Sequence, residues 1–351
     1  MKILKTLAIS GLVSAGTAAG AWLDGADPHH SITGLPGAAG WRTAVQASAT
    51  GIATPDLGAA TPAQVERFFA RLSPAARTAL ARRAPGIVGN LDGAPYRLRY
   101  AANERTAHVR PAGRLLAYDP RGDGRVVEVF GDLARAQRII VIVPGSGWTL
   151  HKLLAAAGPD KANPIAGAQA LLAETHRLAP TVDVAVVVWL GYDAPENIDR
   201  QAARSERAIA GAPGLVRFLA GLPGHATVTL VGHSYGTVVA ARAADSPRVT
   251  NVVALASPGM DVGSAAGLHT RARVWAARVP GDPIGYTPHV RIGGYGHDTD
   301  PIDPRFGATV FRTGSAHGHG GYYAPGTESL TNLARIALGR TAEVTLVDHA
   351  N

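Results

Sequence analysis

The sequence of 351 residues predicts an α/β fold, in which helices cover both faces of a mostly parallel sheet, with a helical extension before it. Three observations predict this fold. From about residue 115, short apolar runs rich in Val and Ile alternate with helical patterns. Before that point, the clear patterns are helical. Finally, a serine flanked by glycines follows the apolar run 228–231 and precedes the small residues 237–242, as at a turn from strand to helix.

The first 21 residues have the pattern of a secretory signal peptide. Lys2 and Lys5 give a positive start, residues 7–19 are apolar and small, and residues 19–21 offer an A-x-A cleavage site. An uncleaved membrane anchor is the alternative, but the apolar run is short and contains Gly, Ser and Thr. Residues 22–60 are rich in Gly, Ala, Pro and Thr without a sustained period, so we expect a linker or a loosely packed arm.

Residues 61–114 are expected to form a helical extension that braces the main domain. Thr61 is a candidate N-cap, because Pro62 follows at the first helical position and Gln64 lies three residues after the cap. A second helix is expected from residue 74 to a stop at Pro85-Gly86, then a turn at 90–93 and a short helix at 101–105. Phe68 and Phe69 are expected in the core rather than in a ligand site.

Residues 115–351 are expected to form the main domain. It begins with a hairpin, residues 115–118 and 125–130, whose turn contains Asp123-Gly124. The remaining strands are expected at 139–143, 182–190, 227–231, 251–256, 273–278 and 308–312, with an edge strand at 343–347. The helices are expected at 164–178, at 198–210, at 215–219 after a break or kink at 211–214, at 237–242 and at 329–338.

The composition excludes several classes of function. A hydrophobic content of 46% with 17% charged residues is typical of a globular protein. The formal charge of +8 comes from basic residues scattered among acids, without the basic stripe and aromatics of a nucleic-acid groove, so no nucleic-acid partner is expected. The absence of Cys excludes disulfides, a thiol nucleophile and Cys-based metal sites.

Residues 232–236 fit the G-x-S-x-G motif, in which a sharp, strained turn presents a serine. The glycines are expected because the turn packs against neighbouring backbone, where a Cβ would collide. With 42 glycines in the chain, a chance match is the alternative. Because the motif follows a buried strand and precedes small helical residues, we interpret Ser234 as a nucleophile.

A serine hydroxyl needs a base, and the base needs an acid that orients it. On an α/β-hydrolase fold the acid and then the histidine follow the serine in the chain. Asp282, just after the strand at 273–278, is the preferred acid, and Asp261 is the reserve. His317 and His319 are the candidate bases, since both follow the last core strand on a loop rich in glycine.

An oxyanion formed at this serine needs two N–H donors. The amide of Tyr235 is expected to be one, and the loop at 144–148 supplies the other, from Ser146 or from Gly145. His233 is expected to belong to the turn rather than act as base. The His317–His319 pair lacks an obvious third metal ligand, and residues 297–300 are expected to form a loop held by Asx turns, so no metal or cofactor is predicted.

Nine short segments, taken together and in this order, resemble one known family: 89–93, 101–103, 143–145, 191–195, 232–236, 257–259, 282–284, 300–308 and 319–322. It is the actinobacterial α/β-hydrolase family long catalogued as a domain of unknown function, the ten-twenty-three family. The resemblance covers about residues 61–339 and implies an α/β-hydrolase fold with a helical N-terminal extension. It supports Ser234 and Asp282 and favours His319 over His317. Gly320-Gly321 replaces an expected, more polar pair, which predicts a more mobile loop here.

The predicted function is that of a secreted or envelope-associated serine hydrolase, similar to esterases and lipases, that cleaves a carboxylic ester. A lipid or another acyl ester is the favoured substrate class, while acyl transfer and peptide or lactone substrates stay open. The rival is a non-catalytic binding protein of the cell envelope on the same scaffold, since a fold does not determine a function.

Overall fold

The computed structural model describes residues 34–49, 51–155, 163–198 and 200–347. The predicted signal peptide, residues 1–21, lies outside these ranges, as does the first part of the predicted linker. Within the described ranges, no helix combines the length and apolar character needed to cross a membrane.

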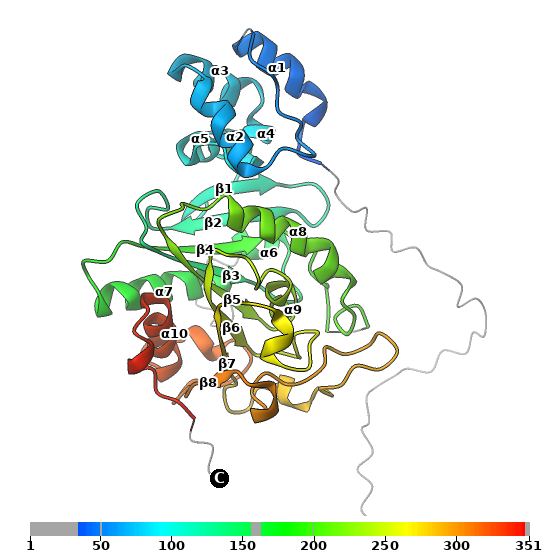
Figure 1. Cartoon of the computed structure of the whole chain (residues 1–351), viewed down its shortest axis with the longest axis vertical. Helices are drawn as coiled ribbons and strands as arrows, with labels where there is room; N and C mark the ends of the chain where they lie inside the picture. The colour runs from blue at the N-terminus through cyan, green and yellow to red at the C-terminus, as the bar shows by residue number, and fades with distance from the viewer. Residues whose placement is uncertain (1–33, 50, 156–162, 199, 348–351) are drawn as a thin grey trace, which may run out of the picture. The chain divides into compact units, whose positions relative to one another are not determined.

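Eight strands form a single sheet in the order β1-β2-β4-β3-β5-β6-β7-β8 (Figure 1). β1 and β2 form an antiparallel hairpin, β2 pairs antiparallel with β4, and the six strands from β4 to β8 pair in parallel. This confirms the mostly parallel sheet and the early hairpin. The strands are β1 (Arg114–Asp119), β2 (Arg125–Phe130), β3 (Arg138–Val143), β4 (Val184–Leu190), β5 (Thr227–His233), β6 (Val249–Leu255), β7 (Arg273–Ala277) and β8 (Thr309–Val310).

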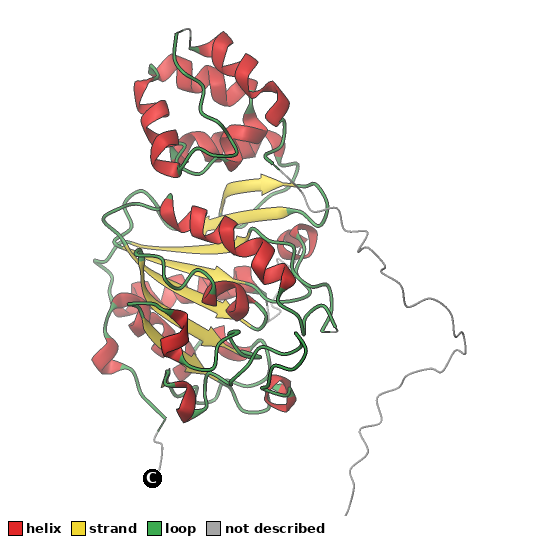
Figure 2. Cartoon of the chain, turned by 45° about the vertical axis from the view of Figure 1, so that its right-hand side comes forward, coloured by secondary structure: helices red, strands yellow, loops and turns green. Residues whose placement is uncertain are grey.

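Helices cover both faces of this sheet. α7 (Pro164–Leu178) and α10 (Glu328–Leu338) pack together on one face, and α8 (Glu206–Ala220) and α9 (Gly236–Ala241) pack together on the other (Figures 1 and 2). The central strands are therefore buried on both faces and are continuous apolar runs. The remaining elements are α6 (Leu150–Ala155) and the 3-10 helices η2 (Ala265–Leu268), η3 (Pro283–Tyr286), η4 (Pro304–Phe306), η5 (Gly321–Tyr323) and η6 (Thr341–Glu343).

The N-terminal helices have a hydrophobic core of their own. They are η1 (Ala38–Gly40), α1 (Trp41–Ser48), α2 (Pro62–Arg71), α3 (Pro74–Arg83), α4 (Pro85–Asn90) and α5 (Tyr96–Thr106). The capping box of α2 is confirmed, since Gln64 N donates to Thr61 Oγ1 (3.3 Å) and Thr61 N donates to Gln64 Oε1 (2.7 Å). Phe68 and Phe69 are buried in this core, as predicted.

Buried and half-buried polar side chains attach these helices to the first strand of the sheet. The amide of Asn90 pairs with both backbone groups of Tyr118, each at 2.8 Å. Asn103 Nδ2 donates to Leu115 O (3.0 Å), and Arg99 Nε donates to Leu116 O (3.1 Å). Because each bond satisfies a backbone group of β1, the helical extension covers a strand that would otherwise be a sheet edge.

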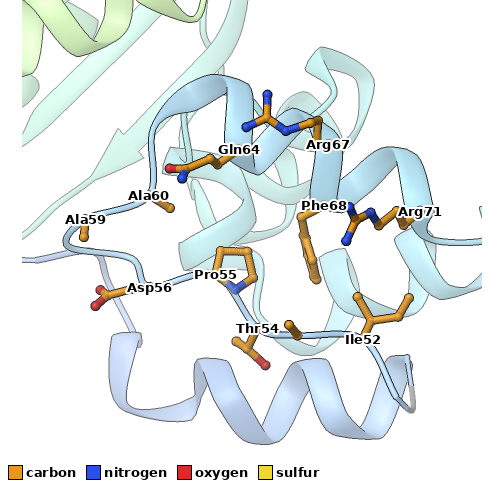
Figure 3. A pocket seen from close by; sticks show the side chains of 11 residues that line it. Ile52, Thr54, Pro55, Asp56, Ala59, Ala60, Gln64, Arg67, Phe68 and Arg71 are labelled. Carbon is orange, nitrogen blue, oxygen red and sulfur yellow. The ribbon is translucent and has the colours of Figure 1, made fainter.

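The extension also contains a cavity of about 420 Å³, between α2 and residues 52–60 (Figure 3). The ring of Phe68 forms part of its wall, with Pro55 opposite. Arg67 and Arg71, one helical turn apart, line the same cavity. Phe68 is thus a core residue that also faces a cavity.

One expectation for the N-terminal region is wrong, and a second is confirmed but incomplete. Residues 41–48 form α1 instead of a linker, because Trp41 and Val45 are buried in the helical core. Pro85 does not only end α3. It is also the first residue of α4, a position where its missing N–H costs no helical hydrogen bond.

Three expectations for the main domain are also wrong. Residues 198 and 200–205 are not helical. α8 begins at Glu206 and continues without a break through Pro213. Pro213 has no N–H, so the carbonyl of Ile209 loses its helical donor. Pro213 is exposed, and this carbonyl is therefore on the side of the helix that meets water. The edge strand at 343–347 is reduced to an isolated bridge between Phe311 and Leu346.

Candidate active site

Ser234 sits in a strained turn between β5 and α9. Its φ is +54°, a left-handed conformation that is uncommon for a residue other than glycine. Two backbone contacts hold it there: Ser234 N donates to Leu255 O of β6 (2.9 Å), and the hydroxyl of Thr237 donates to Ser234 O (2.8 Å). Thr237 Oγ1 also lies 2.8 Å from Ser257 Oγ, which ties the turn to the loop after β6. The serine is therefore fixed at the carboxyl end of the parallel sheet.

The two motif glycines are needed for close packing of backbone. A Cβ at Gly236 would collide with Val143 O and lie 2.7 Å from Pro144 O. A Cβ at Gly232 would lie 2.5 Å from the Cα of Thr237. Both distances are shorter than side-chain carbons adopt, which explains the glycines in physical terms.

We expect Gly236→Ala to lower the free energy of unfolding by about 2–3 kcal/mol, because the new methyl group meets backbone that cannot rotate away. Urea unfolding measures the difference. Gly40→Ala is the matched control, since Gly40 has a negative φ and open space where a Cβ would be, so this change should be neutral or slightly stabilising. Equal stability of the two variants would contradict the packing argument.

Asp282 and His319 are joined by a hydrogen bond. His319 Nδ1 lies 2.8 Å from Asp282 Oδ1. The carboxylate side chain is fully buried, while the imidazole is 30% exposed. Among the described residues, no hydrogen bond joins His319 to the hydroxyl of Ser234. Such bonds are often longer before substrate binds.

Tyr322 is a third member of this cluster that the sequence did not single out. Its hydroxyl donates to Asp282 Oδ2 (2.6 Å), and Ile284 N donates to Asp282 Oδ1 (3.0 Å). Burial alone would raise the pKa of Asp282, but the hydrogen bonds from His319, Tyr322 and Ile284 outweigh it and lower that pKa. Asp282 is thus held as a carboxylate with both oxygens occupied.

His233 and His317 have different surroundings. His233 Nε2 donates to His319 O (2.7 Å), and the two rings meet edge to face at 4.9 Å. Burial, with a smaller contribution from His319, lowers the pKa of His233 to about 4, so it is neutral at pH 7. His317 is exposed, and its Nδ1 lies 3.3 Å from the carbonyl oxygen of Ser315. The structure thus brings His319, and not His317, to the turn that carries Ser234.

The loop after β3 approaches the serine closely. A Cβ at Gly145 would lie 2.7 Å from Ser234 Cβ and 3.0 Å from Tyr235 N, so only glycine fits. Gly147 N donates to Pro195 O (2.7 Å). Among the described residues, the amides of Ser146 and Tyr235 donate no backbone hydrogen bond. These two N–H groups, from the loop and from the residue after Ser234, remain available near the serine.

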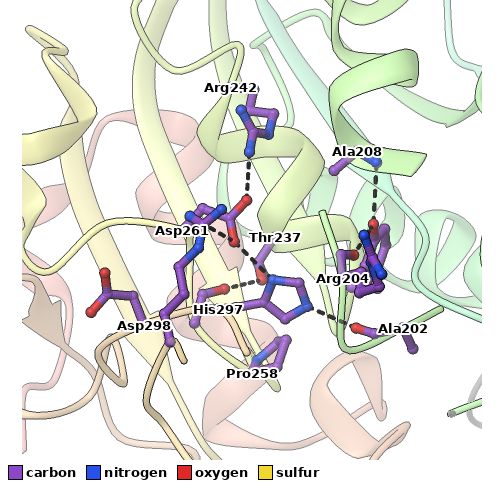
Figure 4. Close-up of polar contacts among 12 residues, drawn as sticks. Ala202, Arg204, Ala208, Thr237, Arg242, Pro258, Asp261, His297 and Asp298 are labelled. Carbon is purple, nitrogen blue, oxygen red and sulfur yellow. Dashed lines mark hydrogen bonds and ion pairs between the residues drawn. The ribbon is translucent and has the colours of Figure 1, made fainter. Parts of the chain in front are cut away.

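A second buried histidine and aspartate lie beside the turn (Figure 4). His297 Nδ1 lies 2.8 Å from Asp261 Oδ1, and Arg242 donates to Asp261 Oδ2 at 2.6 Å. The other ring nitrogen of His297 lies 2.7 Å from Ala202 O. Asp261, the reserve acid, is thus paired with His297 and Arg242 instead of His319. The sequence missed this pairing, although both residues follow strands of the sheet.

The edge of His297 meets the ring of Tyr235, with centroids 5.5 Å apart. The hydroxyl of Tyr235 donates to Arg204 O (2.7 Å) and accepts from Ala208 N (3.2 Å). This cluster therefore fixes the residue after Ser234 against the segment before α8. In the part of the chain that the structure describes, no group of three His, Asp or Glu side chains is placed to hold a metal ion.

We expect Asp261→Asn to lower the free energy of unfolding by about 3 kcal/mol at pH 7, because it leaves Arg242 without its buried anionic partner. Burial raises the pKa of Asp261, but bonds from His297 and Arg242 outweigh it and lower the pKa to about 2. A lowered folded pKa stabilises the protein above the unfolded value, and the stabilisation is lost as the pH falls. The difference between the two proteins should therefore shrink between about pH 4 and pH 2.

The control for this variant is Asp303→Asn. Asp303 also has a pKa lowered to about 2, chiefly by Arg305, but this ion pair is exposed. Its removal should leave urea unfolding unchanged within error, because exposed pairs contribute little. If both variants lose the same stability, burial is not the cause.

Comparison with known proteins agrees with this architecture. The family model described as alpha/beta hydrolase matches residues 119–292. Two uncharacterized proteins of Mycobacterium tuberculosis (strain H37Rv) are similar in sequence. Rv2079 is 32% identical over 268 residues, covering 64% of this chain and 39% of that protein. Rv0963c is 33% identical over 170 residues, covering 45% and 62%. The chain thus spans less than two thirds of the length of either relative.

Solved structures with a similar fold include two hydrolases. An α/β serine hydrolase without a lid from Xanthomonas campestris is 14% identical, with a TM-score of 0.36, over 67% of this chain and 97% of that one. A protein described as a predicted CIB-like hydrolase from Thermoplasma acidophilum is 16% identical, with a TM-score of 0.38, over 64% and 94%. With its sheet order, its serine turn and the matching family model, the chain has the α/β-hydrolase fold.

Proposed function

We propose that the protein is a serine hydrolase that cleaves a carboxylic ester through Ser234, His319 and Asp282. The observation that carries the proposal is the strained serine turn, together with the buried carboxylate of Asp282 bonded to His319, whose ring packs on His233 of that turn. A lipid or another acyl ester is the proposed substrate class, consistent with the exposed apolar side chains on the loop that follows Asp282. The chemistry requires no metal or organic cofactor.

In the proposed mechanism, His319 Nε2 takes the proton of Ser234 as the serine oxygen attacks the ester carbonyl carbon. Asp282 accepts the Nδ1–H bond of His319, which fixes the tautomer and stabilises the imidazolium. The negative oxygen of the tetrahedral intermediate accepts N–H bonds from Tyr235 and from Ser146, with Gly145 allowing the close approach. Collapse breaks the ester bond, and His319 returns its proton to the leaving alcohol.

The second half of the reaction releases the acyl group. His319 deprotonates a water molecule, which attacks the acyl-enzyme carbonyl, and the acid leaves as the proton returns to Ser234. We also propose that the protein is secreted or associated with the cell envelope, from the N-terminal pattern, and that it belongs to the ten-twenty-three family.

Intact mass after treatment with a fluorophosphonate tests this function. We expect a single adduct on the wild-type protein, no adduct on Ser234→Ala and very slow labelling of His319→Ala. His317→Ala is the matched control and should label at the wild-type rate. Labelling that is lost in His317→Ala and kept in His319→Ala would overturn the choice of base. A folded wild-type protein that takes no adduct would favour the non-catalytic binding protein.

A further inference from the structure

The loop between Asp282 and His297 exposes an unusual number of large apolar side chains. Nine such side chains are exposed among the described residues, and four lie on this loop: Tyr286 (88%), Val290 (51%), Ile292 (73%) and Tyr295 (43%). A fifth, Ile198 (80%), comes from the segment between β4 and α8 that contacts the base of the loop. Figure 1 shows the loop, in orange after β7, extending away from the sheet. Apolar side chains gathered in this way usually mark a contact surface.

The backbone of this loop is well held, so the exposure is not a consequence of missing local structure. Ile292 and Tyr295 exchange both of their backbone hydrogen bonds, at 2.9 and 3.0 Å. Gly293 and Gly294 have φ of +57° and +84°, as a tight hairpin turn requires. The hairpin therefore presents the side chains of Ile292 and Tyr295 in a fixed arrangement.

The two ends of the loop are anchored to the site. At its start, Asp282 caps η3 by accepting from Ile284 N, and the same carboxylate bonds His319. At its end, Gly296 N donates to Ala203 O (2.7 Å), and His297 bonds Asp261. The loop thus begins at the acid of the proposed triad and ends at the histidine that packs on Tyr235, the residue after Ser234.

The charge of the loop indicates what kind of partner fits it. No Asp or Glu occurs between Pro283 and His297, whereas Arg291 is a cation within it. The Arg291 side chain is 40% exposed, and its Nη1 lies 3.9 Å from Asp261 Oδ1, a long ion pair that leaves the cation partly open to solvent. Tyrosines with apolar side chains and an arginine suit the boundary between lipid acyl chains and phosphate headgroups, where an arginine reaches the phosphate.

We propose that the loop from Tyr286 to Tyr295 docks the protein on an anionic phospholipid surface. Ile292, Val290 and Tyr286 enter the region of the acyl chains, and Arg291 contacts the phosphates. The part of this proposal that concerns the substrate, a lipid ester taken from that surface, rests on the proposed function. The part that concerns membrane binding does not, since docking needs neither Ser234 nor His319.

Co-sedimentation with unilamellar vesicles tests the docking surface. The protein is mixed with vesicles of phosphatidylglycerol and phosphatidylcholine, or of phosphatidylcholine alone, at low and at high salt. We expect wild-type binding that is tighter to the anionic vesicles and weaker at high salt. The double variant Tyr286→Ser with Ile292→Ser should lower the partition coefficient by roughly tenfold or more, because two large exposed side chains no longer enter the lipid.

Two further proteins separate the possible outcomes. Leu346→Ser removes an exposed apolar side chain (43%) that lies outside this loop, near the C-terminal end of the described chain, and should bind like the wild type. Ser234→Ala should also bind like the wild type, so failed hydrolysis and failed docking remain distinguishable. Absence of wild-type binding, or equal binding by the double variant, overturns the proposal. A concentration-dependent dimer that the double variant abolishes, without vesicle binding, would instead identify the surface as an interface between two copies.

Discussion

Replacing Ser234 with alanine is expected to lower kcat for a soluble short-chain ester by roughly 10⁴- to 10⁶-fold, the range measured when a serine hydrolase loses its nucleophile. Without the hydroxyl, no acyl-enzyme forms, and only the binding of substrate and the two N–H donors still assist water. Steady-state hydrolysis of the ester by purified protein measures the loss. KM should change far less than kcat, because the missing atom acts in the transition state.

The control is Ser315→Ala, which removes an exposed hydroxyl from the loop that leads to His319. This variant should keep the wild-type kcat. The thermal unfolding temperature of Ser234→Ala should be close to that of the wild type, so that lost activity is not lost folding. Equal activity in Ser234→Ala and the wild type would show that any hydrolysis comes from elsewhere in the protein or from a contaminant.

Most of the sheet was predictable because its strands are buried on both faces. Buried parallel strands such as β3 and β4 are continuous apolar runs rich in Val and Ile, a local signal that needs no knowledge of their neighbours. The errors arose where tertiary contacts decide the structure. Residues 41–48 have a composition typical of a linker, yet Trp41 packs edge to face on Phe68 and makes the segment helical. Pro213 is a helix breaker in sequence, but in α8 it faces water.

The candidate site was likewise predictable where its signal is local in the sequence, and not where it depends on tertiary contacts. The serine turn was predictable, because its chemistry and its glycines lie within five residues. The preference for His319 over His317 needed the family resemblance, since both histidines have the same local pattern. The role of Tyr322, which lies in the segment 319–322, was not predictable, because its bond to Asp282 spans 40 residues. The pairing of Asp261 with His297 spans 36 residues and depends on how two loops meet, which no local pattern encodes.

Asp282→Asn is expected to lower kcat by about 10⁴-fold at neutral pH, while leaving Ser234 and His319 in place. An amide cannot hold His319 in the tautomer whose Nε2 accepts the proton of Ser234, nor stabilise the imidazolium that forms. The measurement is kcat for the short-chain ester across a pH series. Asp261→Asn, in the neighbouring pair, should lower kcat far less, since Asp261 does not contact His319. Equal losses would show that the acid of the proposed triad is misassigned.

The variant Tyr322→Phe tests how much the hydrogen bond from Tyr322 contributes to the ionisation of Asp282 and to the position of its carboxylate. The hydroxyl of Tyr322 stabilises the ionised carboxylate, so its loss should raise the pKa of Asp282 toward the ordinary value. Because a lowered pKa stabilises the folded protein above the unfolded value, the variant should lose stability near neutral pH and begin acid unfolding at a higher pH than the wild type. The carboxylate stays ionised at pH 7 in both proteins, so kcat there should fall only about tenfold, through a less firmly held His319. A loss as large as that of Asp282→Asn would mean that Tyr322 itself takes part in proton transfer.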